Sequence, residues 1–184
     1  QPTLSRLENR ITKKEINSIR SFFIEQFIGT YEKPPEELVL DIDGWDAETH
    51  GEQQLSLFHG YYSQYMYFPV LINEAQSGYP LVLQLRAGNS HSGKGVTGLL
   101  RWLFWRLKKA WPGVRIILRG DAGFSLPEVI NVCEKSEVYY ALGFSSNAVL
   151  KRKIDYLLNQ ARLQYFRTQE KARLFDDVYY AAQT

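Results

Sequence analysis

Hydrophobic positions recur at two spacings along the chain, and the change from one to the other divides it into helices and strands. In residues 12–28 the apolar positions stand three or four apart, which predicts a helix. They are Ile16, Ile19, Phe23 and Phe27. Thr12 and Glu15 fit a capping box at its start, and Gly29 can end it. Residues 1–11 are interpreted as the end of an earlier helix.

Short apolar runs of the kind that forms strands occupy residues 38–43, 61–73, 79–86, 114–118, 138–142 and 173–182. Helical spacing returns at 96–110, 125–135 and 147–168, and residues 44–58 are expected to form a loop. The turn Gln76-Ser77-Gly78 predicts an antiparallel hairpin, whereas the later alternation of strands and helices predicts parallel strands with right-handed crossovers. We therefore expect a mixed sheet in an α/β fold with α/β/α layers.

Composition excludes several classes of protein. The 184 residues are 45% hydrophobic with 13 glycines and 7 prolines, which excludes a disordered or fibrous chain. Cys133 is the one cysteine, so no internal disulfide can form, and no apolar run reaches the ~18 residues of a membrane span. A cytoplasmic protein without a membrane anchor is expected.

The net charge of +2 hides an uneven distribution. Basic residues gather in 101–119 and 151–153, and acidic residues gather in 36–52. An acidic centre beside basic surfaces suits an anionic substrate approached through metal ions. The alternative interpretation is that these are ordinary solvated helix faces.

Two aspartates stand where predicted strands end, Asp43 after the first and Asp121 after the fourth. Sites in open α/β sheets form at the carboxyl ends of strands, so these carboxylates could meet and hold Mg²⁺ or Mn²⁺. Asp41 is a rival to Asp43, because both side chains point to the same face of the strand. The alternative is that both aspartates only cap turns.

Other motifs point to different chemistry. Residues 88–95 match the GxxxxGK pattern of a nucleotide-binding P-loop between a strand and a helix, but Gly95 replaces the required Ser or Thr. The three histidines lack metal-ligand spacing, and His91 is interpreted as supporting a site or capping its loop. Cys133 and the tryptophans of the helix at 96–111 (Trp102, Trp105, Trp111) are interpreted as packing residues.

Several motifs in one order resemble insertion-sequence transposases with a group 1 DDE domain, a bacterial family with the RNase H-like fold. The matching stretches are Pro2–Asn9, Leu40–Asp43, Thr49–Gln53, Phe58–Tyr62, Leu85–His91 and Arg119–Phe124. The resemblance implies DNA cleavage and strand transfer by two metal ions, Mg²⁺ or Mn²⁺. It implies that Asp43, rather than Asp41, and Asp121 are two of three carboxylate ligands. Asp41, Asn89 and His91 are further candidates for a supporting role at this site.

The resemblance also implies double-stranded DNA as partner, both transposon ends and target, and a homodimer of the full-length protein as a further expectation. Candidate DNA-binding residues are Arg101, Lys108, Lys109, Arg119, Lys151, Arg152 and Lys153. Residues 1–33 are expected to be a helical remnant of an N-terminal region, and 34–184 a catalytic domain that ends before the third carboxylate. Glu128 and Glu134 stand in the wrong place to supply it.

Three functions remain open on the sequence. The first is a transposase fragment that binds metal weakly. The second is an inactive remnant that at most binds DNA through its basic clusters. The third is a P-loop-like nucleotide-binding protein.

Overall fold

The computed structural model of the chain describes residues 6, 10–51 and 53–181. The chain divides into two compact units, Gln1–Gly143 and Phe144–Thr184, which are described separately. The first unit holds helices α2 (Lys13–Gly29), α3 (Val96–Ala110) and α4 (Pro127–Lys135) and a 3₁₀ turn, η1 (Ala122–Phe124). Its strands are β1 (Glu37–Gly44), β2 (Ala47–Glu48), β3 (Leu57–His59), β4 (Gln64–Tyr67), β5 (Val70–Glu74), β6 (Pro80–Gln84), β7 (Arg115–Gly120) and β8 (Tyr139–Leu142).

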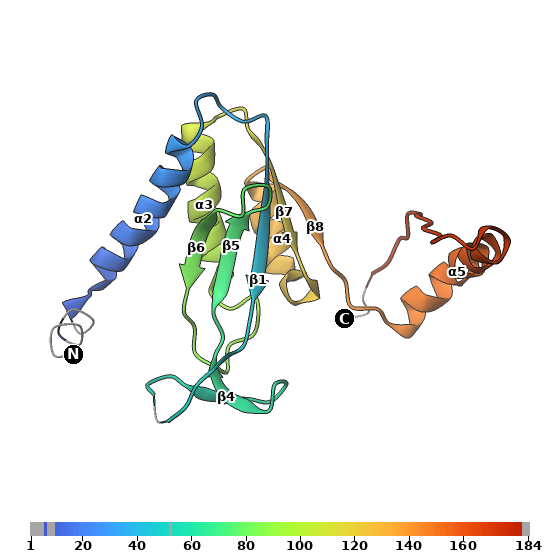
Figure 1. The fold of residues 1–184 in the computed structure, drawn as a ribbon, viewed down its shortest axis with the longest axis horizontal. Helices are drawn as coiled ribbons and strands as arrows, with labels where there is room; N and C mark the ends of the chain where they lie inside the picture. The colour runs from blue at the N-terminus through green and yellow to red at the C-terminus, as the bar shows by residue number, and fades with distance from the viewer. Residues whose placement is uncertain (1–5, 7–9, 52, 182–184) are drawn as a thin grey trace. The chain divides into compact units, whose positions relative to one another are not determined.

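The central sheet of the first unit has five strands in the order β6-β5-β1-β7-β8. β5 and β6 form the predicted antiparallel hairpin, and β5 is also antiparallel to β1. β7 is parallel to β1 and to β8 (Figure 1). This order and these directions are those of the RNase H-like fold, so the predicted mixed α/β sheet is confirmed.

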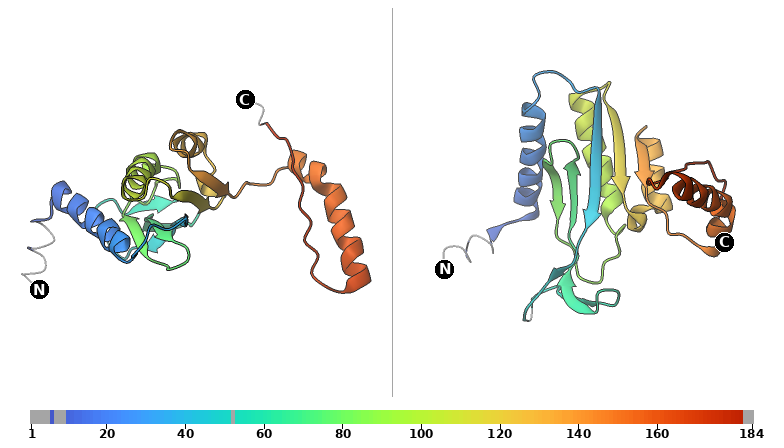
Figure 2. Two further views of the ribbon diagram at one scale, coloured as in Figure 1. Left: turned by 90° about the horizontal axis from the view of Figure 1, so that it is seen from above. Right: turned by 45° about the vertical axis from the view of Figure 1, so that its right-hand side comes forward.

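One face of the sheet is packed against α3 and α4, which lie side by side on it (Figure 2). Because side chains alternate along a strand, β1 sends every second residue into this core. These residues are Leu38, Leu40 and Ile42, none more than 2% exposed. α3 meets them with a stripe at helical spacing that includes Leu100, Leu103, Phe104 and Leu107. Cys133 on α4 is fully buried, as predicted.

Helix α2 joins the same core only through its second half. Ile24 and Phe27 are buried, and the Phe27 ring packs edge-on against Trp111. Ile16, Ile19 and Phe23, predicted to share an apolar face with Phe27, are 40–51% exposed. These three side chains line an open groove together with Leu81 and Leu83 of β6, so they contact the edge of the sheet and stay partly exposed. Figure 1 shows α2 beside β6. The predicted cap is present: the Thr12 amide donates to Glu15 Oε2 at 2.6 Å.

The prediction of one strand over residues 61–73 is wrong. A turn leads into β4, and Phe68-Pro69 separates β4 from β5. Pro69 has no amide hydrogen for a strand ladder, and this interrupts the pairing. β4 pairs instead with β2 and β3 in a separate three-stranded sheet, so residues 44–58 are not wholly loop. In Figure 1 this small sheet lies at the end to which β1 points.

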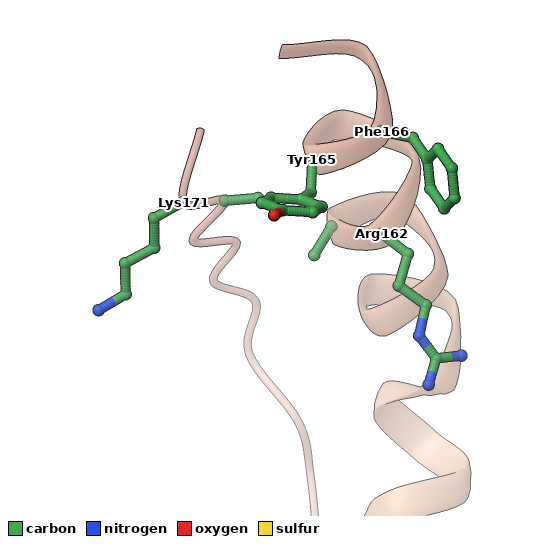
Figure 3. A pocket seen from close by; sticks show the side chains of 6 residues that line it. Arg162, Tyr165, Phe166 and Lys171 are labelled. Atoms are coloured by element: carbon green, nitrogen blue, oxygen red, sulfur yellow. The ribbon is translucent and has the colours of Figure 1, made fainter. Parts of the chain in front are cut away.

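The second unit consists of α5 (Ala148–Thr168) and the segment that follows it. Asn147 caps the helix by accepting a hydrogen bond from the Leu150 amide at 2.9 Å. The predicted strand at 173–182 is absent from 173–181, and residue 182 lies outside the described part. A strand needs a neighbouring strand, whereas this segment packs its side chains along α5. Figure 3 shows a hollow of this unit, with the Tyr165 ring between the helix and the returning chain.

Candidate active site

The parallel pairing of β1 with β7 sets the positions of the two predicted aspartates. Asp41 is registered with Arg119 and Ile42 with Gly120. Asp43 and Asp121 each follow this last pair by one residue. Both strands reach their carboxyl ends here, so both aspartates are exposed at the same edge of the sheet.

Each of these carboxylates is oriented by a backbone amide that follows it. The Gly44 amide donates to Asp43 Oδ1 at 2.7 Å, and the Gly123 amide donates to Asp121 Oδ1 at 2.9 Å. Asp121 thereby caps η1. Within residues 10–51 and 53–181, no group donates a hydrogen bond to the second oxygen of either aspartate. The site therefore presents two oriented carboxylates, each with one oxygen available to a ligand.

Tyr62 is a residue of this region that the sequence did not single out. Burial raises the pKa of Tyr62, and the negative charges of Asp46, Asp121 and Asp43 raise it further. The Tyr62 hydroxyl is therefore within electrostatic reach of both candidate aspartates. In the sequence it appears as one of several aromatic residues of an expected strand, so only the fold reveals its position.

Asp41 has a different environment from Asp43. Arg119 Nε donates to Asp41 Oδ1 at 2.6 Å, and its Nη2 donates to Oδ2 at 2.7 Å. Because Asp41 accepts these hydrogen bonds, the pKa of Arg119 is raised. Both oxygens of Asp41 are thus engaged, which favours Asp43 as the metal ligand. The same pair engages Arg119, which was a candidate for DNA contact.

These residues belong to one row of cross-strand pairs on the same face of β1 and β7. Glu37 forms an ion pair with Arg115, and Asp41 forms one with Arg119. One residue beyond the last pair, both strands continue with an acid, Asp43 after β1 residue Ile42 and Asp121 after Gly120. Like charges side by side are destabilising in a sheet unless a cation lies between them. The row therefore leaves its excess negative charge at the edge where the strands end.

The loop after β6 lies beside the Asp121 turn. A methyl group on Gly123 would come within 2.5 Å of Ser92 Oγ, so Ser92 packs directly on that glycine. Asn89 and His91 are exposed, and within the described residues neither side chain hydrogen-bonds to Asp43 or Asp121. Their supporting role stays a prediction. β6 is antiparallel to its neighbour, unlike the parallel strand that normally precedes a P-loop.

The donors of this edge suit a hard divalent cation, because carboxylate oxygens are the ligands that Mg²⁺ and Mn²⁺ prefer. Within residues 10–51 and 53–181, no group of three or more His, Cys, Asp or Glu side chains is placed to hold a metal ion. Mg²⁺ is commonly held by one or two carboxylates with substrate phosphates completing its shell. The pair therefore fits as part of a metal site.

The candidate DNA-binding residues lie in different parts of the chain. Those on α3 line a groove that also contains Lys135, the last residue of α4, and Ser136, which follows it. Trp105 lies in this groove 56% exposed, with Lys109 Nζ 5.1 Å from its ring centre, so the prediction that it packs in the core is wrong. The groove residues are Arg101, Phe104, Trp105, Lys108, Lys109, Lys135, Ser136 and Glu137. Lys151, Arg152 and Lys153 are exposed on α5 in the second unit.

Among the described helices, none is both long enough and apolar enough to cross a membrane. A comparison with curated protein sequences finds no match. Among solved structures, the chain is similar to the piggyBac transposase in a cryo-EM synaptic complex with hairpin DNA, at 23% identity and a TM-score of 0.47. The match covers 88% of this chain and 32% of that protein, so the chain spans about a third of its length. The family profile of the transposase DDE domain, group 1, matches residues 1–184, and the chain belongs to this family.

Proposed function

We propose that this chain carries part of the catalytic site of a DNA transposase, in which Asp43 and Asp121 hold divalent metal ions against the DNA backbone. The observation that supports this most directly is the β1–β7 register, in which Asp43 and Asp121 each follow the last pair, Ile42 with Gly120, by one residue. Membership of the DDE family supports the reaction class. The proposal includes Mg²⁺ or Mn²⁺ as cofactor and a bacterial insertion sequence as the source.

The proposed reaction is a pair of phosphoryl transfers. In the first, a water oxygen forms a bond to phosphorus, and the phosphorus–O3′ bond breaks to leave a 3′-hydroxyl. In the second, that hydroxyl attacks a phosphodiester of the target strand and displaces its O3′. Bound cations would neutralise the phosphate and lower the pKa of the attacking group. The chain contributes orientation: the Gly44 and Gly123 amides hold one oxygen of each carboxylate and leave the other for the ion.

The third ligand of the site is proposed to come from outside the acids described here. The resemblance implies a glutamate on a helix beyond the last strand, and DNA phosphate oxygens would complete the coordination. The two aspartates by themselves are expected to bind Mg²⁺ or Mn²⁺ weakly. Double-stranded DNA is the proposed partner, a homodimer is proposed for the full-length protein, and the cytoplasm is the proposed location.

Manganese titration, followed by calorimetry with and without a short DNA duplex, tests this proposal. Asp43→Asn and Asp121→Asn should each weaken Mn²⁺ binding by about tenfold or more, because each removes a direct ligand. Asp41→Asn is the matched control, since it changes the same side-chain type on the same strand. Equal losses in all three variants, or no Mn²⁺ binding by the wild type with DNA present, would contradict the assignment.

A chain that binds DNA without catalysis is the second candidate. It is favoured by the finding that no third acid joins the aspartate pair within the described residues. In that case DNA would bind equally well with Mn²⁺ and with chelator. The Asp43→Asn variant would then bind DNA at least as tightly as the wild type, because a negative charge near the phosphates is removed.

A further inference from the structure

A buried arginine, Arg86, lies just beyond β6 and close to both acidic strand ends. It is 6% exposed, and within the described residues no carboxylate pairs with it. Burying a charge without an ionic partner is costly unless hydrogen bonds compensate. The hydrogen bonds that Arg86 makes to the surrounding chain must therefore compensate for the cost of burying its charge.

Among the described residues, the Arg86 guanidinium donates hydrogen bonds only to backbone carbonyl oxygens. Nε donates to Phe68 O at 2.8 Å, and Nη1 donates to Ser92 O at 2.6 Å. Nη1 also lies 3.3 Å from the carbonyl oxygens of His91 and Lys94. Arg86 therefore fastens the 91–94 loop to the junction between β4 and β5.

The remaining nitrogen, Nη2, is directed toward the end of β1. It is buried without a hydrogen-bond partner among the described residues. A methyl group on Gly44 would lie 3.3 Å from Nη2, so the guanidinium packs on the residue that follows Asp43. The Gly44 amide is the donor that orients Asp43.

The connection to Asp121 runs through the loop that Arg86 holds. Ser92, whose carbonyl accepts from Arg86, packs on Gly123. The Gly123 amide orients Asp121. Arg86 thus contacts Gly44, which orients Asp43, directly, and it reaches Gly123, which orients Asp121, through Ser92.

A third connection leads toward Tyr62. The Arg86 guanidinium carbon lies 5.0 Å from the Phe68 ring centre, and the Phe68 and Tyr62 ring centres are 6.1 Å apart. Tyr62 is the aromatic residue whose pKa is raised in part by the charges of Asp43 and Asp121. Chains of contacts therefore lead from Arg86 to Asp43, to Asp121 and to Tyr62.

We propose that Arg86 is a positioning residue of the candidate site, which sets the separation and orientation of Asp43 and Asp121 by holding Gly44 and the 91–94 loop together. This inference rests on the proposed metal-binding role of the two aspartates. Lysine cannot replace arginine here, because one ammonium cannot match the planar fork that spans Phe68, Ser92 and Gly44.

The test uses the chain in solution and follows the amide signals and exchange rates of Gly44 and Gly123 by NMR. Arg86→Lys should shift both signals and speed their exchange by about tenfold, since both strand ends lose their common support. Val132→Ala on α4 is the control, because it removes buried volume from the core and leaves the loop contacts in place. Changes confined to residues 86–94, or changes at the two glycines as large in Val132→Ala, would overturn the proposal.

A second variant keeps the test decisive if Arg86→Lys does not fold. Gly44→Ala adds a methyl group 3.3 Å from Arg86 Nη2, from Phe68 Cζ and from Pro69 O, so it presses on the junction that Arg86 holds while Arg86 itself is unchanged. It should perturb the distant Gly123 amide through the guanidinium and the loop. An unchanged Gly123 signal in this variant would contradict the coupling.

Manganese affinity separates this inference from the proposed function. Arg86→Lys should weaken Mn²⁺ binding by about tenfold, as losses of supporting groups around metal ligands do, while Val132→Ala leaves it unchanged. If the wild type binds no Mn²⁺, the proposed function fails, and the amide signals still decide whether Arg86 couples the two strand ends.

Discussion

Arg119 on β7 donates hydrogen bonds to both carboxylate oxygens of Asp41 on β1, at 2.6 and 2.7 Å. This ion pair gives Asp41 a different environment from Asp43, which is only two residues away in the sequence. Asp41 forms an ion pair with its cross-strand neighbour, whereas Asp43 and Asp121 follow the last pair of the two strands and have no cationic partner among the described residues. The row of pairs along these strands therefore changes from complementary charges to like charges at the end of the sheet.

Removing one acid of the like-charged pair should stabilise the metal-free chain. Asp43→Asn or Asp121→Asn relieves a cross-strand repulsion, and we expect a gain of ~0.5 kcal/mol in the free energy of unfolding in urea with chelator present. Asp41→Asn should lower that free energy, because it leaves Arg119 without its partner. A loss of stability in all three variants would count against repulsion at this edge.

Side chains on the two faces of α3 should differ sharply in their effect on stability. Phe104 is 1% exposed and its neighbour Trp105 is 56% exposed. We expect Phe104→Ala to cost about 3–5 kcal/mol in urea unfolding, because it leaves a cavity against the sheet. Trp105→Ala should cost under ~1 kcal/mol, the size of its exposed contact with Lys109. Similar losses in the two variants would contradict the assigned faces.

Replacement by alanine should lower the stability of the chain at Gly88 and raise it at Gly98. A methyl group on Gly88 would overlap the carbonyl oxygens of Met66 and Leu57, so Gly88→Ala should separate the loop from the small sheet. We expect a loss of roughly 2 kcal/mol or more, typical of overpacking. Gly98 lies within α3 with open space around it, and Gly98→Ala should stabilise by ~0.5–1 kcal/mol. Thermal unfolding of the pair measures both effects.

The buried thiol should make stability fall at alkaline pH. Burial raises the pKa of Cys133 from 9.0 to about 11. The folded chain therefore keeps a proton that the unfolded chain releases. The contribution of the protonated thiol to the free energy of unfolding is present in full below pH 9 and is lost as the pH rises to about 11. The loss should approach ~2 kcal/mol and be absent from Cys133→Ala. A thiol reagent that modified the native chain at pH 8 would argue against this burial.

Salt dependence should identify the cations that contact DNA. We expect Arg101→Ala and Lys109→Ala each to reduce by about one the slope of log affinity against log salt, because each phosphate contact releases a counterion. Lys33→Ala, an exposed lysine outside the α3–α4 groove, is the control. Unchanged slopes in the groove variants would leave α3 as an ordinary solvated helix face.

Local pattern was sufficient for much of the fold and failed where partners were distant in sequence. The α3 and α5 ranges and the β5–β6 hairpin follow from spacing and turn residues that lie within each segment. The strand expected at 173–182 is absent from the described residues 173–181, because apolar alternation does not supply a neighbouring strand. Trp105 was misplaced because a single aromatic residue at the margin of a helical stripe can face either side.

By itself the sequence determined the helices, the hairpin and the two acids at strand ends, because these depend on residues close together in the chain. It also carried the family motifs. The tertiary structure decided which acid is neutralised, since the cross-strand register pairs Asp41 with Arg119 and leaves Asp43 and Asp121 unpaired at the ends of their strands among the described residues. It also revealed Tyr62 and Arg86, whose contacts join segments that no local periodicity connects. Electrostatics and packing act through space, and for these residues the fold alone sets the distances.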